Sequence, residues 1–224
     1  PLAYERSNLA AFLHVLELSK THQVQRFVYA SSSSVYGGNE KLPFSESDSV
    51  DRPISLYAAT KRANELMASS YAHLFKLQTV GLRFFTVYGP WGRPDMALWK
   101  FTDSILTGKP INVYNNGEMF RDFTYIDDIV EGTVAAIEID GLAADEILNL
   151  GNHRAEKLLD LIAQIELATG KQAVTQFKPL QPGDPVHICA DIEKARRLLG
   201  FAPQTIIAEG VPQFVQWYRK WTHQ

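Results

Sequence analysis

Two short apolar runs on either side of a long helix-forming segment limit the folds available to this chain. Arg26–Ala30 and Thr79–Phe85 are rich in apolar and aromatic residues, as is typical of strands buried in a parallel sheet. Residues 56–75, between them, contain neither proline nor glycine and read as one long helix. A strand, a helix and a second strand in this order form a βαβ unit. The sequence therefore predicts an α/β protein built on a parallel sheet.

A tyrosine and a lysine four residues apart, Tyr57 and Lys61, lie near the start of the predicted helix. Positions i and i+4 share a helix face, and an ammonium group beside a phenol stabilises the phenolate, which can take a proton from a sugar hydroxyl. The alternative to a catalytic pair is that Tyr57 is a surface tyrosine packed on the aliphatic part of the Lys61 side chain. The serine run 31–34 follows the first strand, at the edge where open α/β sheets place their sites, and this favours catalysis.

Composition excludes several classes of protein. With 224 residues, 46% of them hydrophobic, the chain can bury one or two cores. A net charge of -3 gives no support for a nucleic-acid partner, and no apolar run reaches membrane-spanning length. The single cysteine, Cys189, excludes an intrachain disulfide and is typical of a reducing compartment. We therefore expect a cytoplasmic protein, and we expect no metal site.

The elements become shorter after Gly89. An acidic pair, Asp127-Asp128, is typical of a helix N-cap. We assign residues 1–90 to the sheet domain and residues 91–224 mainly to a small mixed α/β substrate lobe, with 123–150 returning to the sheet. The predicted helices of this part are 96–107, 127–139, 158–169, 191–199 and 206–221, and the predicted strands are 111–114, 123–125 and 147–150.

No glycine-rich turn of the kind that binds dinucleotides is present. In dinucleotide-binding proteins, a G-x-G-x-x-G or G-x-x-G-x-x-G array lets the backbone approach the pyrophosphate. None of the 14 glycines of this chain falls in such an array. There is also no room before the first strand for a βαβ unit of about 30 residues. Either the protein needs no dinucleotide or the chain is the back part of a longer protein, and we expect the second.

Four segments carry a family resemblance: 29–37, 57–61, 81–97 and 121–128. Together they resemble the extended short-chain dehydrogenase/reductase family, in its NAD-dependent nucleotide-sugar epimerase/dehydratase branch, and most closely the UDP-glucuronate 4-epimerase group. The resemblance runs from Tyr4 to Trp221. It implies an α/β fold made of the back half of a Rossmann-like parallel sheet and a small mixed α/β lobe that binds the UDP-sugar.

The resemblance also implies roles for individual residues. Tyr57 would deprotonate the sugar 4-hydroxyl, Lys61 would hold the nicotinamide ribose and favour the phenolate, and Ser32 would be the catalytic serine. NAD would take a hydride from C4 and return it to the other face of a 4-keto sugar. The contacts to NAD implied by the resemblance are Asn8, Tyr57, Lys61, Phe84, Phe85 and Val87.

Arginine is the most informative residue type among the implied substrate contacts. Arg121 resembles the UDP-binding arginine of the family, since a planar fork suits diphosphate oxygens; its alternative role is a salt bridge with Asp122 or Asp127. Arg93 would face the sugar diphosphate, or it braces its loop against Trp91. The full implied set for the UDP-sugar is Ser33, Ser34, Thr86, Arg93, Val113, Tyr114 and Arg121.

Hydroxyl side chains at three of these positions indicate which member of the branch this is. Dehydratases and decarboxylases carry acids after the catalytic serine, where this chain has Ser33 and Ser34. Hydroxyls cannot supply the acid of an elimination, but they can hydrogen-bond a uronate carboxylate, as can Thr86. This favours UDP-glucuronate/UDP-galacturonate 4-epimerisation. A UDP-hexose or UDP-N-acetylhexosamine 4-epimerase and a noncatalytic sugar-nucleotide-binding fragment remain open.

An oligomer is also implied by the resemblance. The family commonly dimerises through its long helices, which are residues 2–20 and 56–75 here. Candidate interface residues are Leu66, Met67, Tyr71 and Leu74, each of which could equally belong to the core of the chain.

Overall fold

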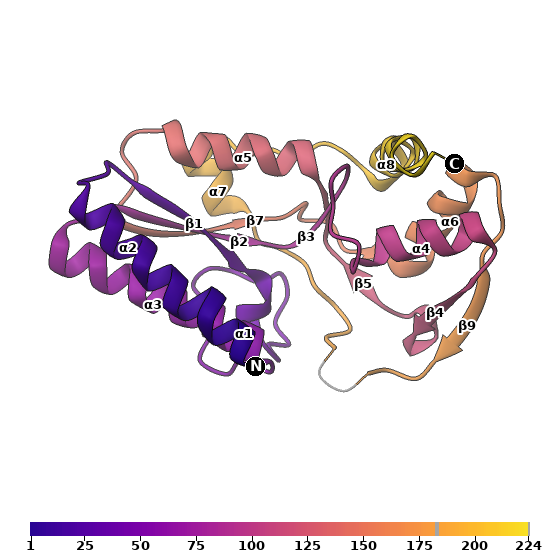
Figure 1. The fold of residues 1–224 in the computed structure, drawn as a ribbon, viewed down its shortest axis with the longest axis horizontal. Helices are drawn as coiled ribbons and strands as arrows, with labels where there is room; N and C mark the ends of the chain where they lie inside the picture. Colours follow the sequence, from indigo (N-terminus) through magenta and orange to yellow (C-terminus); the bar gives the residue numbers. More distant parts are fainter. Residues whose placement is uncertain (182–183, 224) are drawn as a thin grey trace. The chain divides into compact units, whose positions relative to one another are not determined.

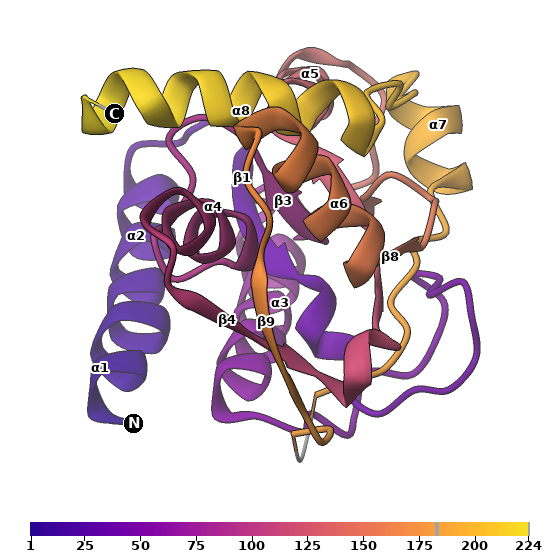
Figure 2. The ribbon, with the colours of Figure 1, turned by 90° about the vertical axis from the view of Figure 1, so that its right-hand side faces the viewer.

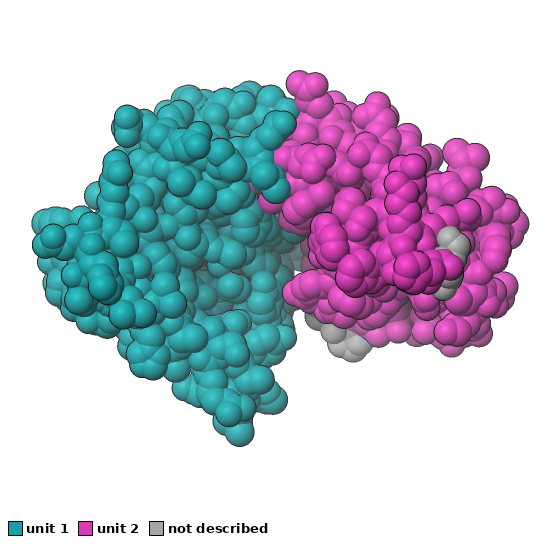
Figure 3. Space-filling view, turned by 45° about the horizontal axis from the view of Figure 1, so that its top comes forward, with its two compact units in different colours: residues 1–85, 130–150, 190–202 teal, residues 86–129, 151–189, 203–224 magenta. Residues whose placement is uncertain are grey.

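The computed structural model describes residues 1–181 and 184–223 and divides them into two compact units. Unit 1 comprises residues 1–85, 130–150 and 190–202, and unit 2 comprises residues 86–129, 151–189 and 203–224 (Figure 3). The boundary therefore falls after Phe85, and residues 190–202 belong with the sheet rather than with the lobe. Within the described residues, every helix is too short or too polar to cross a membrane.

A three-stranded parallel sheet forms the centre of unit 1. Its strand order is β1 (Phe27–Ser32), β2 (Thr79–Phe84) and β7 (Asp145–Leu150). Val80 on β2 and Leu148 on β7 are fully buried, and burying one such side chain contributes about 1.5–3 kcal/mol. The predicted α/β class, its parallel pairing and the βαβ unit are confirmed.

Helices cover both faces of this sheet (Figure 1). On one side lie α2 (Ala11–Thr21) and α3 (Leu56–Phe75), and on the other lie α7 (Glu193–Leu199) and most of α5 (Ile126–Glu138). The predicted bounds of α3 are confirmed. It begins at Ser55, whose Oγ accepts a hydrogen bond from the Ala58 amide at 3.1 Å, an arrangement that satisfies one of the free N–H groups of the first turn.

The predicted first helix is interrupted. It consists of α1 (Leu2–Tyr4), a π-helical turn (Glu5–Ala10) and α2. One extra residue per turn leaves part of the usual hydrogen-bond ladder open, and such turns are frequent at functional sites. Apolar periodicity does not reveal a π-turn, because the apolar residues still recur along one side of the helix.

The register of the sheet brings three polar residues into one row. Ser31, Arg83 and Asn149 are direct partners across β1, β2 and β7, near the carboxyl ends of the strands. Gly81 lies two residues before Arg83 on β2 and has Tyr29 and Ile147 as its partners; a Cβ added to it would lie 2.6 Å from the Tyr29 hydroxyl. Glycine is therefore needed at this position to accommodate the tyrosine ring, and the sheet keeps its register around that contact.

In the part of unit 2 that the structure describes, short strand pairs and helices surround an apolar core. Phe101, Leu161 and Phe214 are among the buried residues of this core. Figure 2 shows β4 and β9 running together, which they do in parallel register. The strands are β3 (Thr86–Tyr88), β4 (Pro110–Tyr114), β5 (Phe120–Arg121), β6 (Phe123–Tyr125), β8 (Glu156–Lys157) and β9 (Val174–Lys178), and the helices are α4 (Ala97–Thr107), α6 (Leu158–Thr169) and α8 (Ile207–Thr222).

Several features of unit 2 differ from the sequence prediction, which did not include the short strands β3, β5 and β8. Strand β9 was not predicted, because its five residues are all exposed and carry no apolar run; the pairing with β4 creates the strand. The predicted N-cap at Asp127-Asp128 is wrong, since α5 begins at Ile126 and places both acids inside its first turn. Asp128 instead accepts hydrogen bonds from the backbone amides of Gln204 and Thr205.

Candidate functional site

Tyr57 and Lys61 lie side by side at the start of α3. The Lys61 ammonium is 6.0 Å from the centre of the Tyr57 ring and donates a hydrogen bond to the Ala30 carbonyl of β1 at 3.0 Å. Burial lowers the pKa of Lys61. The i, i+4 spacing therefore produces the predicted neighbours, and it places the ammonium next to the strand that carries the serines.

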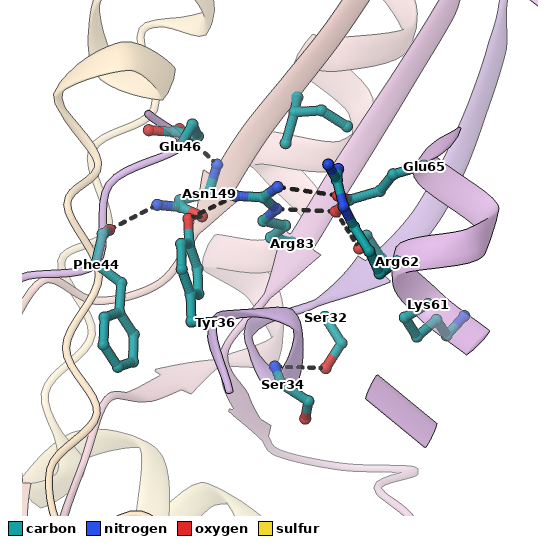
Figure 4. Close-up of polar contacts among 12 residues, drawn as sticks. Ser32, Ser34, Tyr36, Phe44, Glu46, Lys61, Arg62, Glu65, Arg83 and Asn149 are labelled. Carbon is teal, nitrogen blue, oxygen red and sulfur yellow. Dashed lines mark hydrogen bonds and ion pairs between the residues drawn. The ribbon is translucent and has the colours of Figure 1, made fainter. Parts of the chain in front are cut away.

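Ser32 closes β1 and opens a 3-10 turn formed by residues 33–36. Its Oγ accepts a hydrogen bond from the Ser34 amide at 3.2 Å (Figure 4), and the side chain is almost fully buried. Ser33 is half-buried and Ser34 is exposed. The turn ends at Gly37, with φ of +60° and the Arg52 carbonyl oxygen 2.3 Å from where a Cβ would stand, so only glycine fits there.

The π-helical turn places Asn8 against α3. The Asn8 side chain donates to Thr60 Oγ1 at 3.0 Å, and the backbone carbonyl of Asn8 accepts a hydrogen bond from Asn64 Nδ2 at 2.6 Å. Thr60 in turn donates to the Tyr57 carbonyl. Asn8 is thus tied to the second and third turns of α3, and both Asn8 and Lys61 line the hollow described next.

A hollow of about 260 Å³ lies between the first helix and β1. Among the described residues, the Lys61 ammonium has a hydrogen-bond acceptor only in Ala30, so two of its three donors are free for a ligand. The ammonium of Lys61, the amides of Asn8 and Asn64 and the hydroxyl of Ser7 are groups that can hydrogen-bond the hydroxyls of a sugar. The wall of the hollow includes Ser7, Asn8, Phe12, Tyr29, Ala30 and Lys61.

The other residues expected near NAD lie at the end of β2 and just beyond it. Phe85 is buried and packs against the Tyr36 ring, with 6.2 Å between ring centres. Phe84 and Val87 are half-buried. Phe84 and Phe85 belong to unit 1, and Val87 belongs to unit 2.

Unit 2 contains a pocket of about 670 Å³. Thr86, Tyr114 and Arg121, three of the residues expected to bind the substrate, lie on its wall. Sequence reasoning missed Lys100 and Asp184, which also line it. Lys100 could have been noticed as a cation on the polar side of a predicted helix, whereas Asp184 is 63 residues from the arginine that it contacts.

Arg121 is held in a fixed orientation in this pocket. Its guanidinium donates to Asp184 Oδ1 at 2.7 Å and to the carbonyls of Phe120 and Val186 at 3.0 and 3.2 Å. Arg121 does form a salt bridge, but its partner is Asp184 and not Asp122 or Asp127, as the alternative prediction had it. Burial lowers the pKa of Arg121 and the Asp184 carboxylate opposes that shift, but arginine stays protonated in proteins.

Two other residues predicted to contact the substrate, Val113 and Arg93, do not line this pocket. The Val113 side chain is fully buried in the core of unit 2, because strand alternation turns it inward where its neighbour Tyr114 reaches the pocket. Arg93 is exposed and forms a bidentate ion pair with Asp95. Of these two residues, Asp95 lines the pocket.

Comparison with known proteins assigns the chain to a family. The model of the NAD-dependent epimerase/dehydratase family matches residues 1–151. The chain belongs to this family. A probable UDP-glucuronate 4-epimerase of Rhizobium meliloti is 44% identical over 97% of the chain and 69% of its own length. An uncharacterized 37.6 kDa protein of Escherichia coli O111:H- is 50% identical over 98% of the chain and 70% of its own length.

A solved structure of this family has the same fold. The UDP-glucuronic acid 4-epimerase of Bacillus cereus, in complex with UDP-glucuronic acid and NAD, is 36% identical and has a TM-score of 0.89. The match covers 96% of the chain and 68% of the Bacillus protein. The Rossmann-like fold and the family resemblance found in the sequence are thereby confirmed.

Proposed function

We propose that this chain is part of a UDP-sugar 4-epimerase that interconverts UDP-glucuronate and UDP-galacturonate with bound NAD. The observation that carries the proposal is the Tyr57–Lys61 pair on α3, next to the strand that ends in Ser32. Similarity to a probable UDP-glucuronate 4-epimerase and to a solved one supports it.

The chemistry assigned to the chain is proton transfer at the sugar 4-oxygen. Tyr57 takes the 4-hydroxyl proton, and Ser32 holds the same oxygen by a hydrogen bond. NAD, held at its nicotinamide end by Asn8 and Lys61, would supply the hydride acceptor for the sugar C4 and the hydride donor for the opposite face of the same carbon. Tyr57 then gives the proton back to the oxygen, so that proton and hydride are both restored and only the configuration at C4 has changed.

Each unit is assigned one ligand. Unit 1 would bind the nicotinamide end of NAD through Asn8, Lys61 and the residues at the end of β2. The pocket of unit 2 would bind UDP, with Arg121 on the diphosphate and Tyr114 near the base. The hydroxyls of Ser33 and Ser34, both in unit 1, would hydrogen-bond a uronate carboxylate, which favours this substrate over a neutral sugar.

The proposed function is tested by product chromatography. The 224-residue chain, and a version extended at its N-terminus with the corresponding residues of the Escherichia coli relative, are each incubated with NAD and UDP-glucuronate. We expect UDP-galacturonate from the extended version. Conversion of UDP-glucose or UDP-N-acetylglucosamine alone would overturn the uronate assignment, and no conversion of any UDP-sugar would overturn the epimerase.

Replacing Arg121 with alanine should weaken UDP-sugar binding selectively. Hydrogen bonds to charged groups contribute about 1.5–3 kcal/mol, so we expect KM for UDP-glucuronate to rise about 10- to 100-fold in the active extended protein with little change in kcat. Arg219→Ala is the matched control, because this arginine donates to the Thr169 carbonyl and does not line the pocket. An equal rise in KM in both variants would argue against the assignment.

We also propose a homodimer formed through α2 and α3. Leu66 and Leu74 on α3, and Leu13 and Leu18 on α2, are exposed apolar side chains, and unpartnered apolar faces commonly mark interfaces. Met67 and Tyr71 are half-buried. Sedimentation velocity over a range of concentrations measures the oligomeric state, and a monomer at every concentration would exclude this interface.

A further inference from the structure

A buried ion pair joins the helix that carries Tyr57 to the strand in the middle of the sheet. Arg83 Nε and Nη2 donate to the two oxygens of Glu65 at 2.8 and 2.9 Å (Figure 4). Both residues are only 2% exposed. Glu65 follows Lys61 by one helical turn and Tyr57 by two, so the carboxylate is rigidly connected to the two residues proposed to act on the sugar.

The same pair holds both ends of the segment that contains Ser32. At the start, the Ser31 hydroxyl donates to Glu65 Oε1 at 2.6 Å. At the end, Arg83 Nη1 donates to the Tyr36 hydroxyl at 3.0 Å. Between these two anchors, the Ser32 side chain accepts a hydrogen bond from the Ser34 amide, which lies within the same segment.

Tyr36 extends the anchoring to the third strand. Its hydroxyl donates to Asn149 Oδ1 at 2.7 Å, and Asn149 Nδ2 donates to the carbonyls of Phe44 and Asp191. Burial raises the pKa of Tyr36 to about 12, although Arg83 opposes the shift. The hydroxyl therefore stays protonated, and it can accept from Arg83 while donating to Asn149.

We propose that Glu65, Arg83 and Tyr36 form a positioning network that holds the Ser32 hydroxyl at a fixed place relative to Tyr57. The network spans α3, β2 and the 3-10 turn, and all three of its members are buried. The proposal rests on the proposed function, because it assigns Ser32 to the reacting oxygen. None of the three needs to touch the substrate, since they act through the two ends of the serine segment.

Tyr36→Phe is the most selective test in the active extended protein. It removes one oxygen but keeps the ring, which stacks on Phe44 with 4.8 Å between ring centres. A misplacement of about 1 Å can cost up to 100-fold in rate; for a looser serine segment we expect kcat to fall about tenfold, with KM for UDP-glucuronate within about twofold.

A double-mutant cycle separates positioning from general structural damage. In a Ser32→Ala background, Tyr36→Phe should change kcat by less than about twofold, because the hydroxyl that the network positions is already absent. Tyr218→Phe is the control: its buried hydroxyl donates to Asp103 in unit 2, and it should leave kcat unchanged in both backgrounds. An equal loss from Tyr36→Phe with and without the Ser32 hydroxyl would overturn the proposal.

Amide hydrogen exchange supplies a readout that does not depend on activity. In the 224-residue chain, residues 31–37 should exchange about tenfold faster in Tyr36→Phe and at the original rate in Tyr218→Phe. Unchanged exchange in Tyr36→Phe would refute the network even if no UDP-sugar were converted. An inactive parent protein with faster exchange in the variant would instead refute only the proposed function.

Discussion

Tyr57→Phe is expected to lower kcat for UDP-glucuronate epimerisation in the active extended protein by about 100- to 10,000-fold, the range contributed by a positioned acid–base group. The substitution removes the phenol oxygen that takes the 4-hydroxyl proton and keeps the ring beside Lys61. Product formation followed by chromatography measures the effect. Binding of UDP-glucuronate, measured by calorimetry, should change less than about tenfold, because the UDP contacts are assigned to the other unit.

Tyr71→Phe is the matched control for this prediction. Tyr71 lies on the same helix, and its hydroxyl bonds to Glu17 rather than facing the serine segment. This variant should retain the activity of the parent protein. If Tyr57→Phe kept more than a tenth of kcat, or if both variants lost activity alike, Tyr57 would not be the acid–base group.

Arg83→Met is expected to have the largest effect on stability. Removing one partner of a buried ion pair leaves the other charge uncompensated and costs about 3–5 kcal/mol in the free energy of unfolding. Glu65 would be that charge, because its side chain is 1% exposed and only Arg62 would remain as a cationic partner. Urea unfolding of the 224-residue chain and its variant measures the difference.

Arg93→Met tests whether the effect depends on burial. Arg93 and Asp95 form an ion pair with both side chains exposed, and such pairs contribute about 0–1 kcal/mol. This variant should therefore unfold close to the parent chain. A similar loss in the two variants would mean that the buried position of Arg83 carries no special cost.

The loss in free energy of unfolding caused by Arg83→Met should become smaller as the pH falls. Burial opposes ionisation of Glu65, but hydrogen bonds from Arg83, Ser31 and Arg62 outweigh it and hold the pKa of Glu65 below its ordinary value. The parent chain therefore gains stability from Glu65 above pH of about 4.3, the unfolded pKa, and loses it as pH falls further. Without Arg83, burial favours the protonated form of Glu65. Lowering the pH therefore removes the buried charge and raises the free energy of unfolding of the variant. A loss that grew between pH 7 and pH 4 would contradict this.

Local sequence determined the elements that carry the candidate catalytic residues. The apolar runs predicted β1 and β2, and the helix-forming segment after Ser55 predicted α3 with its observed bounds. These predictions succeeded because they depend on neighbours within a few residues, such as the Ser55 cap and the i, i+4 spacing of Tyr57 and Lys61. The family resemblance followed from local motifs as well: three of them lie on or beside β1, α3 and β2, and the fourth, residues 121–128, runs from β5 into α5.

Contacts between distant residues could not be read from the chain. Glu65 looks like any helix glutamate until the fold buries it against Arg83, 18 residues away, and joins Tyr36 to Asn149, 113 residues away. Strand β9 exists only because β4 pairs with it, and Arg121 has Asp184 as its partner rather than a neighbour in sequence. The sequence alone determined which residues can act, because spacing along one element is a local property. The tertiary structure decided what holds them in place, because buried charges and hydroxyls find their partners only when the sheet register and the helix packing bring distant segments together.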